Sequence, residues 1–331
     1  MALIMLERIK WIRNRDAFCA SDAPPRKIYP SNPTKMTTLN QQPTIRRGVL
    51  PAGLLSILSL FTPANAATTV YNAAGANAAA IQGTVDSFRA GLGTLNPNVA
   101  SSFGSGRREI NWDGVPDALA APNNLPGNFF NVNSPRGVVF STPGTGFQVS
   151  ANAGITPVKF GNIDPNYPDI FATFSAQRLF TSLGSTITDV TFFVPGSTVA
   201  AVTRGFGAVF SDVDLANLSS VEYFDSSNVS LGNHFVQNVP GNQTLSFLGV
   251  TFDAPVISRV RITSGNQILA FGNAATDIVV MDDFIYGEPV QARASVPDSG
   301  ATLTLLGIAL GGLGLAARKS GQSSKGSVVS E

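Results

Sequence analysis

The feature that most constrains this chain is a series of short strand-like segments between residues 107 and 290, broken by clusters of Gly, Pro, Asn and Asp. Runs of β-branched and aromatic residues favour strands, and such clusters end them. The clearest strand candidates are 188–194, 206–214, 221–225, 245–252, 258–263 and 277–286. Strands this short, with no long helices between them, predict an all-β fold, an antiparallel β-sandwich of jelly-roll-like type.

Residues 67–295 have to fold without disulfide bonds. The single cysteine, Cys19, lies near the N-terminus, so this part has no disulfide, no thiolate nucleophile and no cysteine zinc site. It contains 10 Lys and Arg against 16 Asp and Glu, a balance of −6, and Lys159 is its one lysine. Phosphate contacts need clustered basic side chains. No nucleic-acid partner is therefore expected.

The N-terminal region has the order of parts of a secretory signal peptide. Arg46 and Arg47 precede an apolar run over 48–61, and small residues at Ala64 and Ala66 form an Ala-x-Ala cleavage site. We therefore expect a signal peptide over 36–66, with signal peptidase cutting after Ala66. Residues 1–35 precede this complete signal, so we expect them to be disordered, an over-extended gene start upstream of translation from Met36.

The C-terminal region has a motif, an apolar segment and a basic stop. The motif is Val296, Pro297, Asp298, Ser299 and Gly300. An uncharged, mostly apolar run over 301–317 follows, at the short end of the length for a membrane span. Arg318 and Lys319 close it and predict a cytoplasmic end. We expect a transmembrane helix over 301–317, then a short polar tail over 320–331.

This arrangement resembles the VPDSG-CTERM sorting signal, a variant of the PEP-CTERM signals, over 296–319. The resemblance implies export, transient tethering in the inner membrane, processing by an exosortase-type enzyme, and release or attachment at the cell surface. Residues 206–286 also resemble a domain of other PEP-CTERM-type proteins in the segments "AVFSDVD", "VEYFD", "SFLGVTFD" and "MDDFIYGEP". That second resemblance implies no activity.

Residues 67–106 are rich in Ala, Gly and Asn, and they predict a leader that packs loosely or caps the sandwich. A short helix is expected over 73–81. A second helical candidate covers 82–92, because Val85, Phe88 and Leu92 recur at helical spacing.

Aspartates supply the candidate metal site. Asp282 and Asp283 interrupt the apolar last strand, where alternation predicts that they lie on opposite faces. Asp212 and Asp214 share one face by the same alternation, and Asp113 is a further candidate ligand. Ca²⁺ prefers oxygen ligands of this kind, so the five side chains form a candidate structural calcium site. The alternative is that they bond to backbone N–H groups, cap turns or pair with arginines.

Catalytic and sugar-binding signals are sparse. The single histidine, His234, lies in a segment typical of a turn or the start of a strand. We do not expect it to act as a general base. A glycosidase needs two carboxylates, and nothing marks a pair among acidic residues such as Glu109, Asp113 and Glu222. The aromatic residues that could form a sugar-stacking platform, or else belong to the core, are Trp112, Tyr167, Tyr223 and Tyr286.

Two functions from different classes follow. The first is a non-enzymatic cell-surface or extracellular-matrix protein with a structural or binding sandwich, in contact with polysaccharide and stabilised by calcium. The alternative is a secreted, carboxylate-dependent polysaccharide hydrolase or lyase. An open cleft with two carboxylates favours the enzyme, a flat aromatic patch favours binding, and neither favours a purely structural role.

Overall fold

The computed structural model describes residues 67–273, 277–292 and 307–308 of the 331-residue chain. The expected gene start at 1–35 and signal peptide at 36–66 lie outside the described residues, as do the tail at 320–331 and, except for 307–308, the expected helix at 301–317. Within the described residues, no helix is long and apolar enough to cross a membrane.

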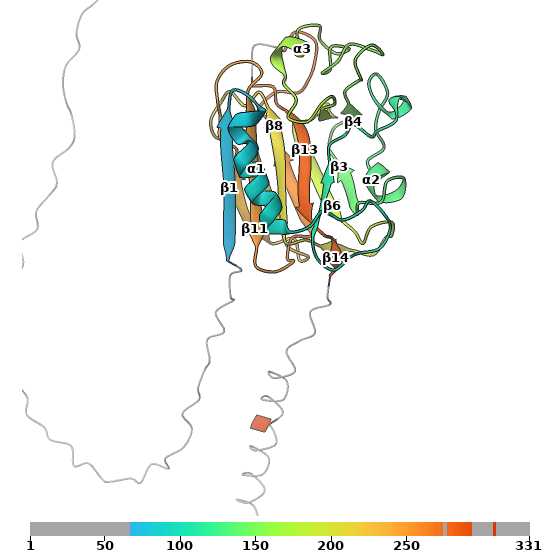
Figure 1. Ribbon diagram of the computed structural model, residues 1–331, viewed down its shortest axis with the longest axis vertical. Coiled ribbons are helices and arrows are strands. Elements are labelled where there is room, and N and C mark those ends of the chain that lie inside the picture. Colours follow the sequence, from blue (N-terminus) through green and yellow to red (C-terminus); the bar gives the residue numbers. More distant parts are fainter. Residues whose placement is uncertain (1–66, 274–276, 293–306, 309–331) are drawn as a thin grey trace, which may run out of the picture. The chain divides into compact units, whose positions relative to one another are not determined.

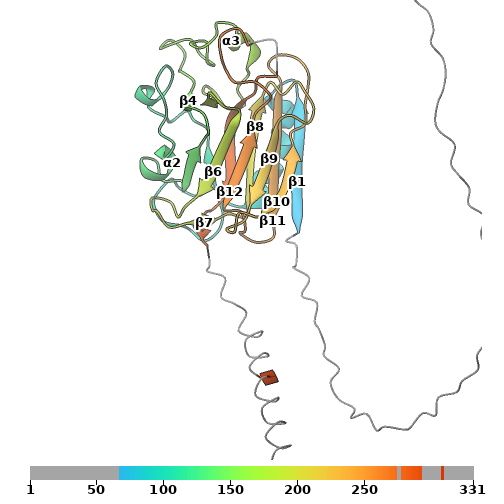
Figure 2. The same cartoon turned by 180° about the vertical axis from the view of Figure 1, so that it is seen from behind.

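Two antiparallel sheets face each other in the folded body (Figures 1 and 2). In the larger sheet the strand order is β1 (Thr68–Gly75), β11 (Leu245–Phe252), β8 (Gly205–Ser211), β13 (Val280–Gly287), β5 (Phe180–Leu183) and β4 (Gly146–Val149), with β2 (Arg107–Ile110) also paired to β13. In the smaller sheet it is β10 (Ser230–Phe235), β9 (Ser220–Phe224), β12 (Arg259–Thr263), β6 (Ile187–Phe192) and β3 (Val138–Ser141). A short ribbon joins β14 (Val290–Gln291) to β7 (Ala201–Val202). The expectation of a mainly β chain with antiparallel sheets is confirmed.

The space between the sheets is filled by an aromatic core. Trp112 stacks on Phe180 with ring centroids 4.1 Å apart, and Phe284 packs edge-on against Trp112 at 5.1 Å. The smaller sheet contributes Val260 and Ile262, both fully buried. These two alternate in β12 with outward-facing arginines, as the sequence predicts for the segment 258–263. One shared core therefore holds the two layers together.

Helix α1 (Ala78–Leu92) covers the outer face of the larger sheet (Figure 1). Its Phe88 ring lies on Gly207 and Gly249, where an added Cβ would come within 3.0 and 2.8 Å of the ring. The helix therefore requires glycine at both positions. For residues 67–106 the sequence left two alternatives, loose packing or capping of the sandwich. The packing of α1 on the sheet matches capping.

The helix expected over 73–81 is wrong in its first part. Residues Thr68–Gly75 form β1, which pairs along its whole length with β11. Asn77 then caps the helix, its side chain accepting from the N–H of Ala80. The pairing with β11 decides the conformation here, because tertiary contacts override weak local preference.

Short helical turns and loops cover the remaining surface. They are η1 (Asp117–Leu119), α2 (Phe129–Val132) and α3 (Tyr167–Ile170). The loop around α3 packs on the start of β13, in a cluster that includes Phe171, Leu269 and Val280. This loop reaches the outer face of the larger sheet beside α1, where most of the acidic side chains of interest lie.

Candidate functional site

Asp282 and Asp283 form a β-bulge in β13. Met281 pairs with Phe210 and Phe284 pairs with Ala208, so the two aspartates together face one residue of β8. The added residue reverses the alternation, and Met281 and Phe284 both point into the core between the sheets. Both carboxyl groups therefore lie on the outer face. The expectation that the two aspartates occupy opposite faces is wrong for this reason.

The two carboxyl groups are closed off by hydrogen bonds. Asp282 Oδ2 accepts from the backbone N–H groups of Phe174 and Ser175 at 2.6 and 3.2 Å. Ser175 Oγ reaches Asp282 Oδ1 at 3.3 Å and Asp283 Oδ1 at 2.6 Å. Arg89 Nη2 donates to Asp283 Oδ2 at 3.2 Å. Since each carboxyl oxygen has a partner and the residues are 0% and 3% exposed, the pair ties the loop to the sheet.

Burial also changes the protonation of this pair. It raises the pKa of Asp282 well above its ordinary value of 3.8, and the charge of Asp283 raises it further. Burial raises the pKa of Asp283 too, but hydrogen bonds from Ser175 and the charge of Arg89 oppose that rise. Burial therefore favours the protonated form at Asp282, and the charge of Arg89 favours the ionised form at Asp283.

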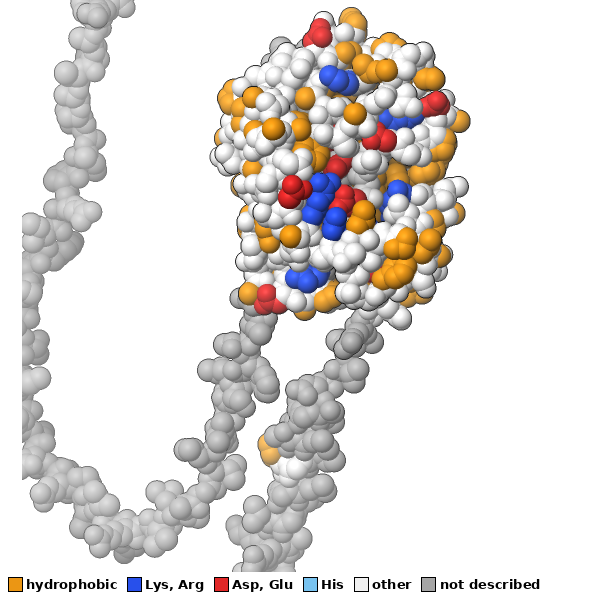
Figure 3. Space-filling view, in the orientation of Figure 1, with side chains coloured by type: hydrophobic (Ala, Val, Ile, Leu, Met, Phe, Trp, Pro, Cys, Tyr) orange, Lys and Arg blue, Asp and Glu red, His pale blue; other side chains and the backbone are white. Residues whose placement is uncertain are grey.

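Arg89 extends the pair into a charged cluster at the surface. Its guanidinium donates to both oxygens of Glu109 at 3.1 and 2.9 Å, and Arg107 Nε donates to Glu109 at 2.6 Å. Figure 3 shows basic and acidic side chains side by side in the middle of this face. Glu222 lies on β9 of the other sheet and accepts from Ser230 Oγ. Glu109 and Glu222 therefore do not form a catalytic pair.

We expect Asp282→Asn to keep the folded state, with a change of less than about 1 kcal/mol in the free energy of unfolding at neutral pH. The amide oxygen still accepts from Phe174 and Ser175, and the neutral amide matches a protonated carboxyl group in shape and charge. Asp282→Ala leaves those two N–H groups without an acceptor and should cost about 1–3 kcal/mol. Urea unfolding of both variants measures the difference, and equal losses would contradict a protonated Asp282.

The same variant tests the pH dependence. An unfolded chain ionises Asp282 near 3.8, whereas the folded chain holds the proton to higher pH. Above about pH 4 the folded state therefore binds more protons, and raising the pH lowers the free energy of unfolding until the folded pKa is passed. Asp282→Asn removes this contribution, so its stability should fall less steeply with pH than that of the wild type. Parallel curves would contradict the assignment.

Asp113 anchors the same loop from a separate position. Its Oδ1 accepts from the backbone N–H groups of Gln177 and Arg178 at 2.5 and 3.1 Å. Together with Asp282 it holds the backbone of residues 174–178. This is the backbone-bonding alternative to metal binding, and the sequence did not show which loop these aspartates would hold.

The remaining two aspartates of the expected calcium set lie at the end of β8. The strand ends at Ser211, and Asp212 has a left-handed φ of 71°, so strand alternation no longer places Asp212 and Asp214. They meet Asp277, which precedes β13 and which sequence reasoning missed as a site residue. Burial, with the charges of Asp214 and Asp277, raises the pKa of Asp212 to about 8.

The five expected ligands are thus divided among three places. Asp212 and Asp214 lie with Asp277, Asp282 and Asp283 form the bulge pair, and Asp113 holds the loop. Across residues 67–273 and 277–292, no three His, Cys, Asp or Glu side chains come together as a group able to hold a metal ion.

The four aromatic residues of the expected sugar platform belong to the core. Each is at most 1% exposed. Their polar tips donate to backbone carbonyls: Trp112 to Asp282, Tyr167 to Ala270, Tyr223 to Phe206 and Tyr286 to Arg136. A buried ring offers no face to a sugar, so the core alternative describes these four residues and the sugar platform does not.

His234 lies in β10, where its ring packs edge-on against Tyr223 with centroids 6.0 Å apart. Partial burial lowers its pKa. It is therefore a strand residue in an aromatic contact.

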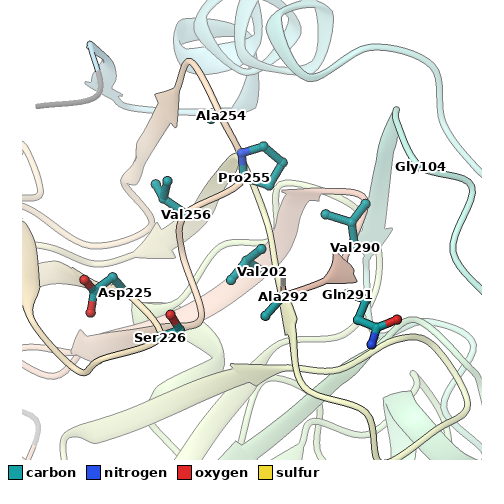
Figure 4. A pocket seen from close by; sticks show the side chains of 10 residues that line it. All are labelled: Gly104, Val202, Asp225, Ser226, Ala254, Pro255, Val256, Val290, Gln291 and Ala292. Carbon is teal, nitrogen blue, oxygen red and sulfur yellow. The ribbon is translucent and has the colours of Figure 1, made fainter. Parts of the chain in front are cut away.

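Hollows mark the surface of the described body, and three of them are relevant here. The first, about 800 Å³, lies beside the β7–β14 ribbon. Figure 4 shows Val202 and Ala292 between Val256 and Val290, with Asp225 at one end and Gln291 at the other. The second, about 490 Å³, has two carboxylates in its lining, Asp253 and Glu288, and the third, about 440 Å³, is lined in part by Asp113.

The carboxylates of the second hollow are not available as a catalytic pair. Glu288 is 3% exposed, and both its oxygens accept from Arg108, at 2.8 and 2.9 Å. Asp253 accepts from the N–H of Ala67 at 3.1 Å. The oxygens of Glu288 are thus committed to Arg108 and do not face a substrate in the hollow.

Comparison with known families identifies a motif in the C-terminal region. The model of the VPDSG-CTERM motif matches residues 295–320. The chain carries a VPDSG-CTERM motif. The sorting signal expected over 296–319 is confirmed. The VPDSG-CTERM motif supports an exported protein and implies processing by an exosortase-type enzyme.

The VPDSG-CTERM motif lies outside the folded body, and the other comparisons concern the chain as a whole. No curated protein matches the chain. Among solved structures, the enzymatically active domain of tailspike protein 4 from bacteriophage CBA120 is similar at 14% identity and a TM-score of 0.24, over 57% of this chain and 23% of that one. A likeness at this level carries no argument about function.

Proposed function

We propose that the chain is a cell-surface or extracellular-matrix protein whose β-sandwich serves as a structural module. The VPDSG-CTERM match over 295–320 carries the proposal, because such a motif supports an exported protein and implies processing by a sorting enzyme. The signal peptide over 36–66 and the membrane tether over 301–317 belong to the same proposal. Signal peptidase and an exosortase-type enzyme are its processing partners.

The sandwich is a jelly roll in this proposal. The strand orders of the two sheets support it. Four neighbouring strands of the larger sheet follow the order β5, β13, β8, β11, and four neighbouring strands of the smaller sheet follow the order β6, β12, β9, β10. Along the chain these eight strands alternate between the sheets, except that β9 and β10 follow each other in one sheet. This order supports the double Greek-key path of a jelly roll.

The buried carboxylates have hydrogen-bond or ion-pair partners within the protein, which favours a structural role over that of a hydrolase or lyase. Asp282 and Asp283 are buried with all oxygens bonded, and Glu288 is held by Arg108. The described aromatic platform residues are also buried. No observation on the described residues favours the enzyme, and association with polysaccharide remains a prediction of the sorting signal's context.

Replacing residues 296–300 by alanine should stop C-terminal processing and keep the chain in the inner membrane. The wild type should be shortened at its C-terminus and be found at the surface or outside the cell. Fractionation with immunoblotting and mass spectrometry of the C-terminus measures both. Alanine at residues 321–325, beyond the matched motif, is the control and should leave sorting unchanged. Equal sorting of all three chains would overturn the proposal.

A further inference from the structure

Asp212, Asp214 and Asp277 crowd together at one end of the larger sheet. Asp212 follows β8 and Asp277 precedes β13, and these strands are antiparallel neighbours with Ser211 opposite Val280. The charges of Asp214 and Asp277 both act on Asp212. Within the described part of the chain, none of the ion pairs includes any of the three aspartates. The cluster therefore holds like charges without a basic partner.

Hydrogen bonds hold the cluster in place, but two of its carboxylate oxygens have no hydrogen-bond partner among the described residues. The N–H of Asp214 donates to Asp277 Oδ1 at 2.8 Å, and the N–H of Gly241 donates to Asp214 Oδ1 at 2.7 Å. Asp212 Oδ1 and Asp277 Oδ2 are buried and have no hydrogen-bond partner among the described residues. Their residues are only 3% and 1% exposed. A buried carboxylate oxygen without a partner is costly, so a ligand at this place would stabilise the fold.

We propose that this cluster binds a calcium ion through Asp212 Oδ1 and Asp277 Oδ2, with Asp214 beside them. Only oxygen donors are present, and Ca²⁺ takes six to eight of these in flexible geometry. The described residues hold no ready group of three acidic side chains for a metal, so the site would use two carboxylates and would need water and backbone carbonyls to complete the coordination. Structural zinc sites are built from Cys and His, and Mg²⁺ demands near-ideal octahedral geometry.

The site differs from the calcium set predicted from sequence. Asp282, Asp283 and Asp113 have their oxygens committed to backbone N–H groups, Ser175 and Arg89. Asp277 takes their place. The inference is independent of the sorting proposal, because it concerns the folded body alone.

Isothermal titration of the full chain with CaCl₂, after dialysis against chelator, tests the binding. A dissociation constant in the range of about 10⁻⁴–10⁻³ M, usual for extracellular modules, is expected. Asp212→Asn and Asp277→Asn should each weaken binding by about 10-fold or more. Asp277→Asn keeps the Oδ1 acceptor for Asp214 and so should still fold. Asp86→Asn on helix α1 makes the same charge change elsewhere and should leave binding unchanged.

Thermal unfolding gives a second readout. Calcium should raise the Tm of the wild type by several degrees, since a ligand that binds the folded state stabilises it. Asp212→Asn should be at least as stable as the wild type in chelator, because Asp212 stands beside Asp214 and Asp277 without a basic partner, and it should lose the rise with calcium. A wild-type Tm equal in calcium and chelator, an unchanged calcium response in Asp212→Asn, or magnesium binding as tight as calcium would each overturn the assignment.

Discussion

Replacing Arg108 with Met should lower the free energy of unfolding by about 3–5 kcal/mol, because it leaves the Glu288 carboxylate buried without a counter-charge. Arg108 is fully buried and Glu288 is 3% exposed. Two parallel hydrogen bonds of 2.8 and 2.9 Å join them, which is the strong bidentate geometry. The same guanidinium also donates to the carbonyls of Val99, Ser101 and Pro135 at 2.8–3.1 Å. The variant therefore loses an ion pair and three backbone contacts together.

Arg261→Met is the matched control for this prediction. Arg261 also pairs with a carboxylate, Asp189, at 2.9 Å, but its side chain is 45% exposed. Exposed pairs contribute about 0–1 kcal/mol. The double variant Arg108→Met with Glu288→Met should recover part of the loss, since it removes the orphaned charge. Urea unfolding compares the three, and an Arg108→Met loss no larger than that of Arg261→Met would contradict the prediction.

The Arg108–Glu288 pair was not readable from the sequence. The two residues are 180 positions apart, and β2 meets β13 only through the folded sheet. Alternation does show which residues of a half-exposed strand point inward, and it placed Val260 and Ile262 of β12 correctly. It fails for β8, β11 and β13, whose residues are buried on both faces, since apolar side chains on both faces hide the period.

The candidate site illustrates the same limit. The aspartates were identified as exceptional because charged residues interrupt apolar strands, and their burial bears this out. Their faces could not be predicted, because the bulge at Asp282 and the left-handed turn at Asp212 each break the two-residue period. The contacts made at these positions also come from residues distant in sequence: Ser175 hydrogen-bonds to Asp283, and the charge of Asp277 acts on Asp212.

Trp112→Ala should lower the free energy of unfolding by about 3–5 kcal/mol, because a large buried side chain leaves a cavity that the core cannot fill. Its ring contacts Phe180 and Phe284, and its Nε1–H donates to the backbone carbonyl of Asp282 in the bulge at 2.8 Å. Trp112→Phe keeps most of the packing but leaves that buried carbonyl without its donor, so a smaller loss of about 1–3 kcal/mol is expected. Phe271→Ala is the control.

Phe271 is 79% exposed, so its replacement should change the free energy of unfolding by less than about 0.5 kcal/mol. Urea unfolding followed by circular dichroism measures all three variants, and a glycan-binding assay on the same samples separates the two roles of an aromatic residue. Replacing a core residue changes the free energy of unfolding and leaves any binding of sugar by the folded protein unaltered. If Trp112→Ala kept full stability and lost polysaccharide binding, the ring would have to be accessible to a ligand, and its assignment to the core between the sheets would be wrong.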